Sequence, residues 1–161
     1  MKSPTCQLII MVLFLTLSGC KKTDKKECPE LNPFYFELNQ VCLSLSAETS
    51  YEDKLYVINS ESELRARLLV RGSATDCIIN YEIFNTDFSK YTLVVGQKKV
   101  GGIVPAMVEQ AIEKNCENNT ITYSATIKNG GYTAIGSYIF AIRIIKQTNS
   151  AKYSEDIKVI N

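Results

Sequence analysis

The sequence predicts an α+β fold, mainly antiparallel β-sheet with one short N-terminal capped helix. Two observations lead to this prediction. Several segments alternate apolar and polar residues with a period of two, and Asn- and Gly-rich turn sequences separate them, which is typical of half-buried strands joined by hairpins. A single segment, residues 61–69, combines leucines at helical spacing with a recognisable helix start.

The composition limits the classes of function. The chain has 161 residues, 18 basic and 17 acidic side chains, and an apolar fraction of 45%. This length allows one domain, or one domain with an appendage, and this apolar fraction is that of a globular protein. Histidine is absent, which excludes Ser-His-Asp and Cys-His catalysis and imidazole ligands for a metal. The balanced charge argues against a nucleic-acid-binding protein, whose surface is normally basic on one face.

The start of the chain predicts a lipoprotein signal peptide. Lys2 gives a basic start, and the apolar run over residues 8–17 is shorter than the roughly 20 residues that span a bilayer. The run ends in Leu17-Ser18-Gly19-Cys20, which resembles the lipobox of bacterial lipoproteins. The resemblance implies cleavage between Gly19 and Cys20 and attachment of membrane lipid to the Cys20 thiol. The alternative is an ordinary cleaved signal with an incidental cysteine.

This interpretation divides the chain into three parts. Residues 1–19 are the signal peptide, residues 20–30 are the lipidated cysteine and a charged tether, and residues 31–161 are a single α+β domain. Two or three acyl chains make a durable anchor, because each buried methylene contributes about 0.8 kcal/mol. Lys21 stands where an Asp would resemble an inner-membrane retention signal, so we expect the outer membrane, on its periplasmic face or at the cell surface. The tether is expected to be solvated, or alternatively to contact anionic headgroups through its lysines.

The cysteines predict disulfides. Cys6 leaves with the signal and Cys20 carries lipid, so the remaining candidates are Cys28, Cys42, Cys77 and Cys116. Exported compartments are oxidising and the number is even, which favours two bridges. Sequence alone does not choose the pairing; we expect Cys28–Cys42 and Cys77–Cys116, because the first pair brackets one short segment. Without a Cys-x-x-Cys spacing or a histidine, no metal site, redox pair or cofactor is predicted.

The first apolar segments predict short strands. Alternation at Val41, Leu43 and Leu45 indicates one strand, and Lys54–Ile58 indicates another. Pro33–Phe36 is interpreted as an edge segment packed on the core. An exposed aromatic binding patch is the alternative for this segment.

A helix is predicted directly after the second of these strands. Ser60 and Glu63 form a capping box, in which each side chain satisfies a free backbone N–H group at the helix start. Leu64 and Leu68 lie one turn apart on the same face. We expect Gly72-Ser73 to end the helix.

The middle of the chain is less regular. Cys77–Phe84 is rich in Ile and aromatic residues, and Asn85-Thr86-Asp87 is a turn signal. Tyr91–Val95 predicts an apolar strand that ends at Gly96. Residues 100–116 fit both the helical and the strand period, and extended structure is favoured because hairpin signals follow.

The last third of the chain predicts strands. Thr120–Lys128 alternates cleanly between the turn signals Asn118-Asn119 and Asn129–Gly131. Its inward-facing residues are expected to be Ile121, Tyr123, Ala125 and Ile127. Tyr138–Lys146 is apolar on both faces except at one Arg, which predicts a central strand. Tyr153–Ile160 is a candidate for the final strand.

Two segments carry a family resemblance. The sequences YVINSESEL at 56–64 and DFSKYTLVVG at 87–96 resemble parts of the PrcB C-terminal-like domain, which is found in many small lipoproteins of Bacteroides and its relatives. The resemblance extends over residues 54–147. It implies that Asp87 and Ser89 shape the turn into a strand. The family is named after a protein that accompanies a surface protease, which implies a binding or accessory role by analogy.

No catalytic group is predicted. Ser89 and Lys90 are adjacent, and adjacent residues on a strand point to opposite faces, which is poor geometry for a Ser-Lys dyad. Glu82 and Asp87 would form a carboxylate pair only if the fold brought them together. Gln97–Gly102 is basic and Gly-rich but lacks the Gly-Lys-Ser/Thr ending of a phosphate-binding loop. We interpret it as a solvated hairpin loop.

The sequence therefore favours a non-catalytic, lipid-anchored envelope module that binds another macromolecule. A protease complex is one candidate protein partner, and a sheet edge or a loop would supply the contact. The alternatives are a histidine-independent hydrolase acting on envelope polymers, and a small glycan-binding lipoprotein that uses the aromatic residues Phe34–Phe36.

Overall fold

The computed structural model describes residues 28–38, 43–45, 52–70, 83, 85–102, 104–131, 134–148 and 150–161. Its elements are β1 (Phe34–Phe36), β2 (Leu43–Leu45), β3 (Lys54–Ile58), α1 (Glu61–Arg67), β4 (Leu68–Val70), β5 (Tyr91–Gly101), β6 (Ala106–Asn115), β7 (Thr120–Lys128), β8 (Ile135–Ile145) and β9 (Lys152–Ile160). The described part of the chain is mostly β. The predicted α+β class with an N-terminal helix is therefore wrong, because the single seven-residue helix in this part lies internally, between β3 and β4.

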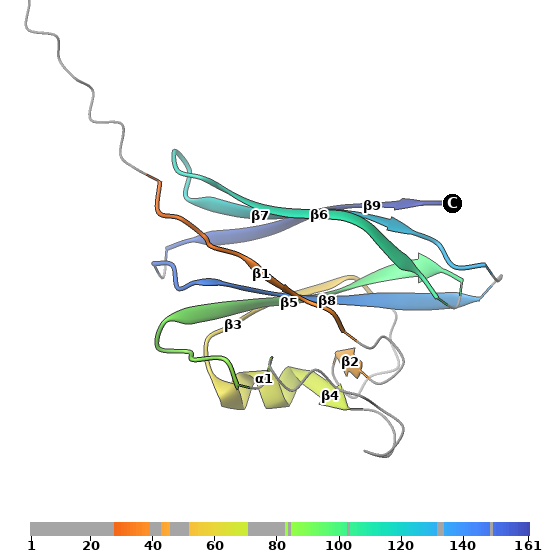
Figure 1. Ribbon diagram of the computed structural model, residues 1–161, viewed down its shortest axis with the longest axis horizontal. Coiled ribbons are helices and arrows are strands. Elements are labelled where there is room, and N and C mark those ends of the chain that lie inside the picture. Colours follow the sequence, from red (N-terminus) through yellow and green to blue (C-terminus); the bar gives the residue numbers. More distant parts are fainter. Residues whose placement is uncertain are drawn as a thin grey trace, which may run out of the picture.

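The strands form two larger sheets and a small one. A four-stranded antiparallel sheet has the order β1-β8-β5-β3, a three-stranded sheet has the order β6-β7-β9, and β2 pairs with β4. The four-stranded sheet lies between the three-stranded sheet and a layer made of α1 and the β2–β4 pair (Figure 1). Strand β9 is parallel to β7, whereas the other strand pairs in the described residues are antiparallel. The parallel pair arises because the chain crosses from one sheet to the other after β8.

The two central strands, β5 and β8, bury both of their faces, as the predicted central strand requires. The residues packed toward α1 and the β2–β4 pair are Leu93, Val95, Ile139 and Ala141. The residues packed toward the three-stranded sheet are Val94, Phe140, Ile142 and Ile144. The predicted inward positions of β7 are confirmed, and they face the second of these groups from the opposite side: Ile121, Tyr123, Ala125 and Ile127.

The helix begins as predicted and ends earlier. The Glu63 N–H group donates to Ser60 Oγ at 3.2 Å, and the Glu63 carboxylate accepts from the Asn59 N–H group at 2.8 Å, one residue before the cap. The helix ends at Arg67 because the following residues pair with β2. The expected end at Gly72-Ser73 is therefore wrong.

Strand β5 continues through Gly96, where the sequence predicted its end. The Phe140 ring lies over Gly96, and a Cβ atom there would be 2.1 Å from the ring. A glycine inside a strand thus makes room for an aromatic ring from the neighbouring strand. Beyond Gly101 the chain turns into β6, so the extended structure favoured for residues 100–116 is confirmed.

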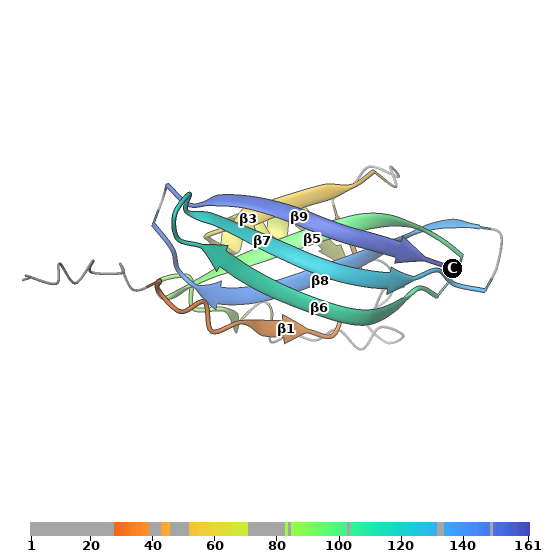
Figure 2. The same ribbon diagram turned by 90° about the horizontal axis from the view of Figure 1, so that it is seen from above.

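The two ends of the sheets differ in what they contain. The described chain begins at one end, which we call the entry end and define as Cys28–Leu31, Cys116–Asn119 and Lys146–Thr148. The opposite, distal end consists of Gly101–Gly102, Val104–Pro105, Lys128–Gly131, Ala134–Ile135 and Ile160–Asn161. Figure 2 shows the three-stranded sheet from above, with β9 on the side of β3 and β6 on the side of β1.

Candidate functional site

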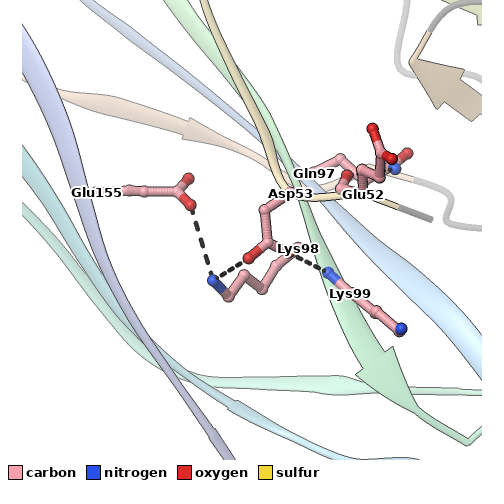
Figure 3. A network of polar contacts seen from close by, with 6 residues as sticks. All are labelled: Glu52, Asp53, Gln97, Lys98, Lys99 and Glu155. Carbon is pink, nitrogen blue, oxygen red and sulfur yellow. Dashed lines mark hydrogen bonds and ion pairs between the residues drawn. The ribbon is translucent and has the colours of Figure 1, made fainter. Parts of the chain in front are cut away.

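A polar cluster lies between the two larger sheets, where β3 approaches β9 (Figure 3). Even-numbered residues of β5 face the three-stranded sheet, so Lys98 points into the space between the layers. Its Nζ atom lies 2.5 Å from Asp53 Oδ2 and 3.8 Å from Glu155 Oε1. Asp53 precedes β3 and Glu155 lies on β9. One ammonium group therefore joins carboxylates that come from two different sheets.

Further hydrogen bonds hold the segment before β3 against β5. The Lys99 backbone N–H group donates to Asp53 Oδ1 at 2.9 Å. Gln97 is buried on the other face of β5, and its Nε2 atom donates to the Glu52 carbonyl at 3.1 Å. The second carboxylate oxygen of Glu155, Oε2, is buried and has no hydrogen-bond partner among the described residues.

The two carboxylates have pKa values shifted in opposite directions. Burial raises the pKa of Glu155 above its ordinary value, and the Asp53 charge adds to this shift while Lys98 opposes it. Burial also acts to raise the pKa of Asp53, but hydrogen bonds from Lys98 and Lys99 together with the two lysine charges outweigh it and lower that pKa. Asp53 therefore keeps its charge to a lower pH than an ordinary Asp, whereas Glu155 takes up a proton at a higher pH than an ordinary Glu.

Opposed pKa values suit acid and base chemistry, but the surroundings of this cluster fit a structural role better. The Lys98 ammonium binds to both carboxylates, and the Lys98 and Glu155 side chains are only 20% and 21% exposed. Among the described residues, the two surface hollows considered below contain none of the three side chains. The cluster thus acts as a clamp between β3 and β9, and we call it the inter-sheet clamp.

The clamp corrects one interpretation of the sequence. Gln97–Gly102 was interpreted as a solvated hairpin loop, but β5 runs through it as far as Gly101 and pairs with β8. Two adjacent lysines and two adjacent glycines concealed the strand. The buried residue Val100, two positions after Lys98, was the available signal of a continuing period of two.

The cysteine prediction is partly right. Cys28 is joined to Cys116, 88 positions further along the chain, so a disulfide is present but the expected pairs Cys28–Cys42 and Cys77–Cys116 are wrong. The Ile145 N–H group donates to the Leu31 carbonyl at 2.8 Å, which places the first described segment beside the end of β8. This tertiary contact leaves no local sequence signal. Four predicted positions lie outside the described residues: Gly19, Cys20, Cys42 and Cys77.

The turn before β5 is built around Asp87, as expected. Its Oδ1 atom accepts from the Ser89 hydroxyl at 2.5 Å and from the Ser89 N–H group at 3.0 Å, and Lys90 Nζ lies 3.3 Å from Oδ2. These hydrogen bonds, first of all those from Ser89, lower the pKa of Asp87. Ser89 and Lys90 therefore both bind Asp87 and form no catalytic dyad. Glu82, the other half of the considered carboxylate pair, lies outside the described residues.

The aromatic segment at β1 is an edge strand packed on the core, as interpreted. Phe36 is buried, and Phe34 is 42% exposed. The Arg143 guanidinium lies 4.8 Å from the centroid of the Phe34 ring and 4.9 Å from that of Tyr91, so it contacts both rings. Phe34 is therefore the exposed aromatic ring that the glycan-binding alternative would use.

Exposed apolar side chains gather at the distal end. The described residues include seven large apolar side chains that are exposed, and five of them lie at this end or within three residues of it. We call these five the distal patch: Val104, Val108, Ile135, Val159 and Ile160. Val104 is the most exposed, at 77%, and Ile135 follows at 58% with Val108. Val108 is the extra residue at a bulge in β6, which removes it from the regular pairing with β7.

Two surface hollows lie elsewhere. One of about 170 Å³ is on the outer face of the three-stranded sheet and is lined mainly by short polar side chains and by Glu109, Asp156 and Lys158. The other, of about 550 Å³, is open and lies between residues 28–33 and residues 112–114 of β6. In the first hollow the Thr126 hydroxyl donates to the exposed Glu109 carboxylate at 2.7 Å, on an open strand surface.

Other classes of site were considered in the same part of the chain. Among the described residues, no group of three or more Cys, Asp or Glu side chains is placed to hold a metal ion, and no helix is long and apolar enough to cross a membrane. Comparison with family models, with curated proteins and with solved structures found no match to this chain. The resemblances to a lipobox and to the PrcB C-terminal-like domain therefore stay predictions, and function is argued from the geometry.

Proposed function

We propose that the chain is a non-catalytic module of the bacterial envelope, anchored in the outer membrane through lipid on Cys20, that binds another macromolecule with its distal end. The proposal rests on one observation: the start of the described chain and the distal patch lie at opposite ends of the sheets. The described chain begins at the Cys28–Cys116 disulfide, whereas the distal patch lies at the far end of the sheets, near the marked C-terminus (Figure 1). An apolar patch is the usual mark of an interaction surface.

The dimensions support this arrangement. Eight peptide units separate Cys20 from Cys28 and reach at most about 28 Å when fully extended. Strand β5 has eleven residues, so the distal end lies about 35 Å beyond the entry end. A lipid on Cys20 would therefore hold the entry end within about 28 Å of the membrane, and a domain standing away from the membrane would present the distal patch to a partner.

The three described carboxyl groups with a shifted pKa hold the fold together, which favours binding over catalysis. The carboxylates that converge on Lys98 join two sheets, and Asp87 holds a turn. An envelope protease complex stays a candidate partner.

The anchor is tested by Cys20→Ala. We expect the variant to leave the membrane fraction and to be recovered as soluble exported protein, whereas wild type floats with the outer membrane. Cys6→Ala is the matched control, because that cysteine leaves with the signal peptide. Unchanged membrane association of Cys20→Ala would contradict the lipid anchor.

Binding is tested by photo-crosslinking in intact cells. A photoreactive amino acid replaces Val104 in the distal patch or, as control, Lys152 at the start of β9 near the entry end; both positions are exposed. We expect one discrete crosslinked species from position 104 that is absent from position 152. The absence of any species at position 104 would count against macromolecular binding, whether or not the anchor is correct.

A further inference from the structure

The distal patch sits on a preformed surface. The Gly102 N–H group donates to the Ala134 carbonyl at 2.6 Å, and the Gly130 N–H group donates to the Gly101 carbonyl at 2.8 Å. These bonds join the turn before β6 to the turn before β8. The Asn129 N–H group also donates to the Ile160 carbonyl, at 2.7 Å, which ties in the end of β9. A surface that is fixed before binding loses little conformational freedom when a partner docks.

The charges around the patch are mainly positive. Three exposed lysines lie within two residues of the distal end or in it: Lys99, Lys128 and Lys158. Within the described residues none of their ammonium groups has an ion pair or a hydrogen bond. Asp53 is paired with Lys98, whereas Glu109, next to Val108, is exposed and accepts from the Thr126 hydroxyl at 2.7 Å, so it keeps its negative charge. The distal end therefore presents an apolar centre with available positive charge around it.

We infer that the occupant of this surface is a protein segment in which Asp or Glu residues flank aliphatic side chains. The inference rests on the proposed function and adds the chemistry of the partner. The aliphatic side chains would pack on Val104 and Ile135, and the acidic groups would approach the lysines. Such charges fix the register of a complex and speed its formation, while the buried apolar contacts supply most of the affinity.

Other occupants fit the surface less well. A second copy of this chain, docked by the same patch, would bring two sets of lysines together, and like charges across an interface oppose binding. A membrane held at Cys20 would lie on the side of the entry end, so the distal patch would meet it only if the domain turned over on its tether; vesicle flotation tests this below. A nucleic acid would use the lysines but would leave the aliphatic side chains unpaired.

A displayed library of random peptides tests this inference on the full chain purified in detergent. We expect selection of peptides that combine Leu, Ile or Val with Asp or Glu. Ile135→Asp and Lys158→Glu should each weaken binding of a selected peptide at least about tenfold, because the first buries a charge and the second reverses one. The matched controls lie on the same strands near the entry end: Ile145→Asp on β8 and Lys152→Glu on β9 should change binding less than about twofold.

Several outcomes would overturn the inference. One is selection of basic peptides, and another is equal weakening by the distal variants and their controls. A third is self-association in sedimentation that Ile135→Asp removes. The last is flotation of the Cys20→Ala chain with phosphatidylglycerol vesicles, if it depends on Ile135, because a lipid surface would then be the occupant. A crosslinked partner at position 104 with no acidic-apolar selection would retain the proposed function and refute only this inference.

Discussion

Removing the Cys28–Cys116 disulfide tests how the first described segment is held to the fold. The change is the double substitution Cys28→Ser and Cys116→Ser, which removes the bridge and leaves no unpaired thiol at either position. The bridge closes a loop between positions 88 apart in the sequence. It lies at the entry end, where the Leu31 carbonyl accepts from the Ile145 N–H group.

The length of this loop sets the size of the effect. A crosslink removes entropy from the unfolded chain as the logarithm of loop length, and a loop of this size corresponds to about 4.6 kcal/mol at 25 °C. This value is an upper bound, because an unfolded chain that keeps residual structure loses less. With a urea m-value of about 2 kcal/mol/M, the unfolding midpoint falls by up to about 2 M.

The assay is urea unfolding followed by circular dichroism, with oxidised wild type beside the double variant. Cys42→Ser with Cys77→Ser is the control, because it retains both residues of the described bridge. We expect the double variant to lose between about 2 and 4.6 kcal/mol. A loss below about 1 kcal/mol would refute the entropic reasoning, and a non-reducing peptide map that joins Cys28 to Cys42 would refute the pairing.

Two further predictions concern the clamp and the distal end. Burial raises the pKa of Glu155 above its ordinary 4.5. The free energy of unfolding of wild type should therefore fall, relative to that of Glu155→Gln, as the pH rises from 4.5 through the raised pKa. A difference between the two proteins that does not change with pH would contradict this. Gly102→Ala should cost at least about 2 kcal/mol in urea unfolding, since Gly102 has φ +84° and a Cβ would lie 2.2 Å from the Gly130 carbonyl oxygen. Gly131→Ala, where a Cβ meets nothing within 4 Å, should have little effect, and equal losses would refute the steric reasoning.

The strands that could be predicted from the sequence have either one buried and one exposed face or two buried faces. In β7 every second residue is apolar, and those residues are the buried ones. In β8 the apolar residues on both faces matched a strand with a layer on each side. Such patterns are local and are set by burial alone, so they can be read without knowing which strands pair.

The features that sequence did not predict depend on tertiary pairing. Leu68–Val70 leaves the helical period because it pairs with β2, and β9 is parallel to β7 because the chain changes sheets. The inter-sheet clamp requires Lys98, Asp53 and Glu155 to meet from three separate segments. Lys98 contributed to the wrong loop prediction, because a lysine inside a strand pattern resembles a loop residue when its ion-pair partners are not known.

The charged residues of β9, including Glu155 of the clamp, help to explain the distal patch. Strand β9 is an edge of its sheet, and exposed edges recruit foreign strands unless charged residues discourage the contact. Here β9 carries Lys152, Asp156 and Lys158 on its outer face and Glu155 on its inner face. These charged residues discourage strand pairing along most of β9, whereas at its end the apolar residues Val159 and Ile160 are exposed. Because the same strand is guarded against association everywhere else, the apolar side chains at its end are best explained by a specific contact there.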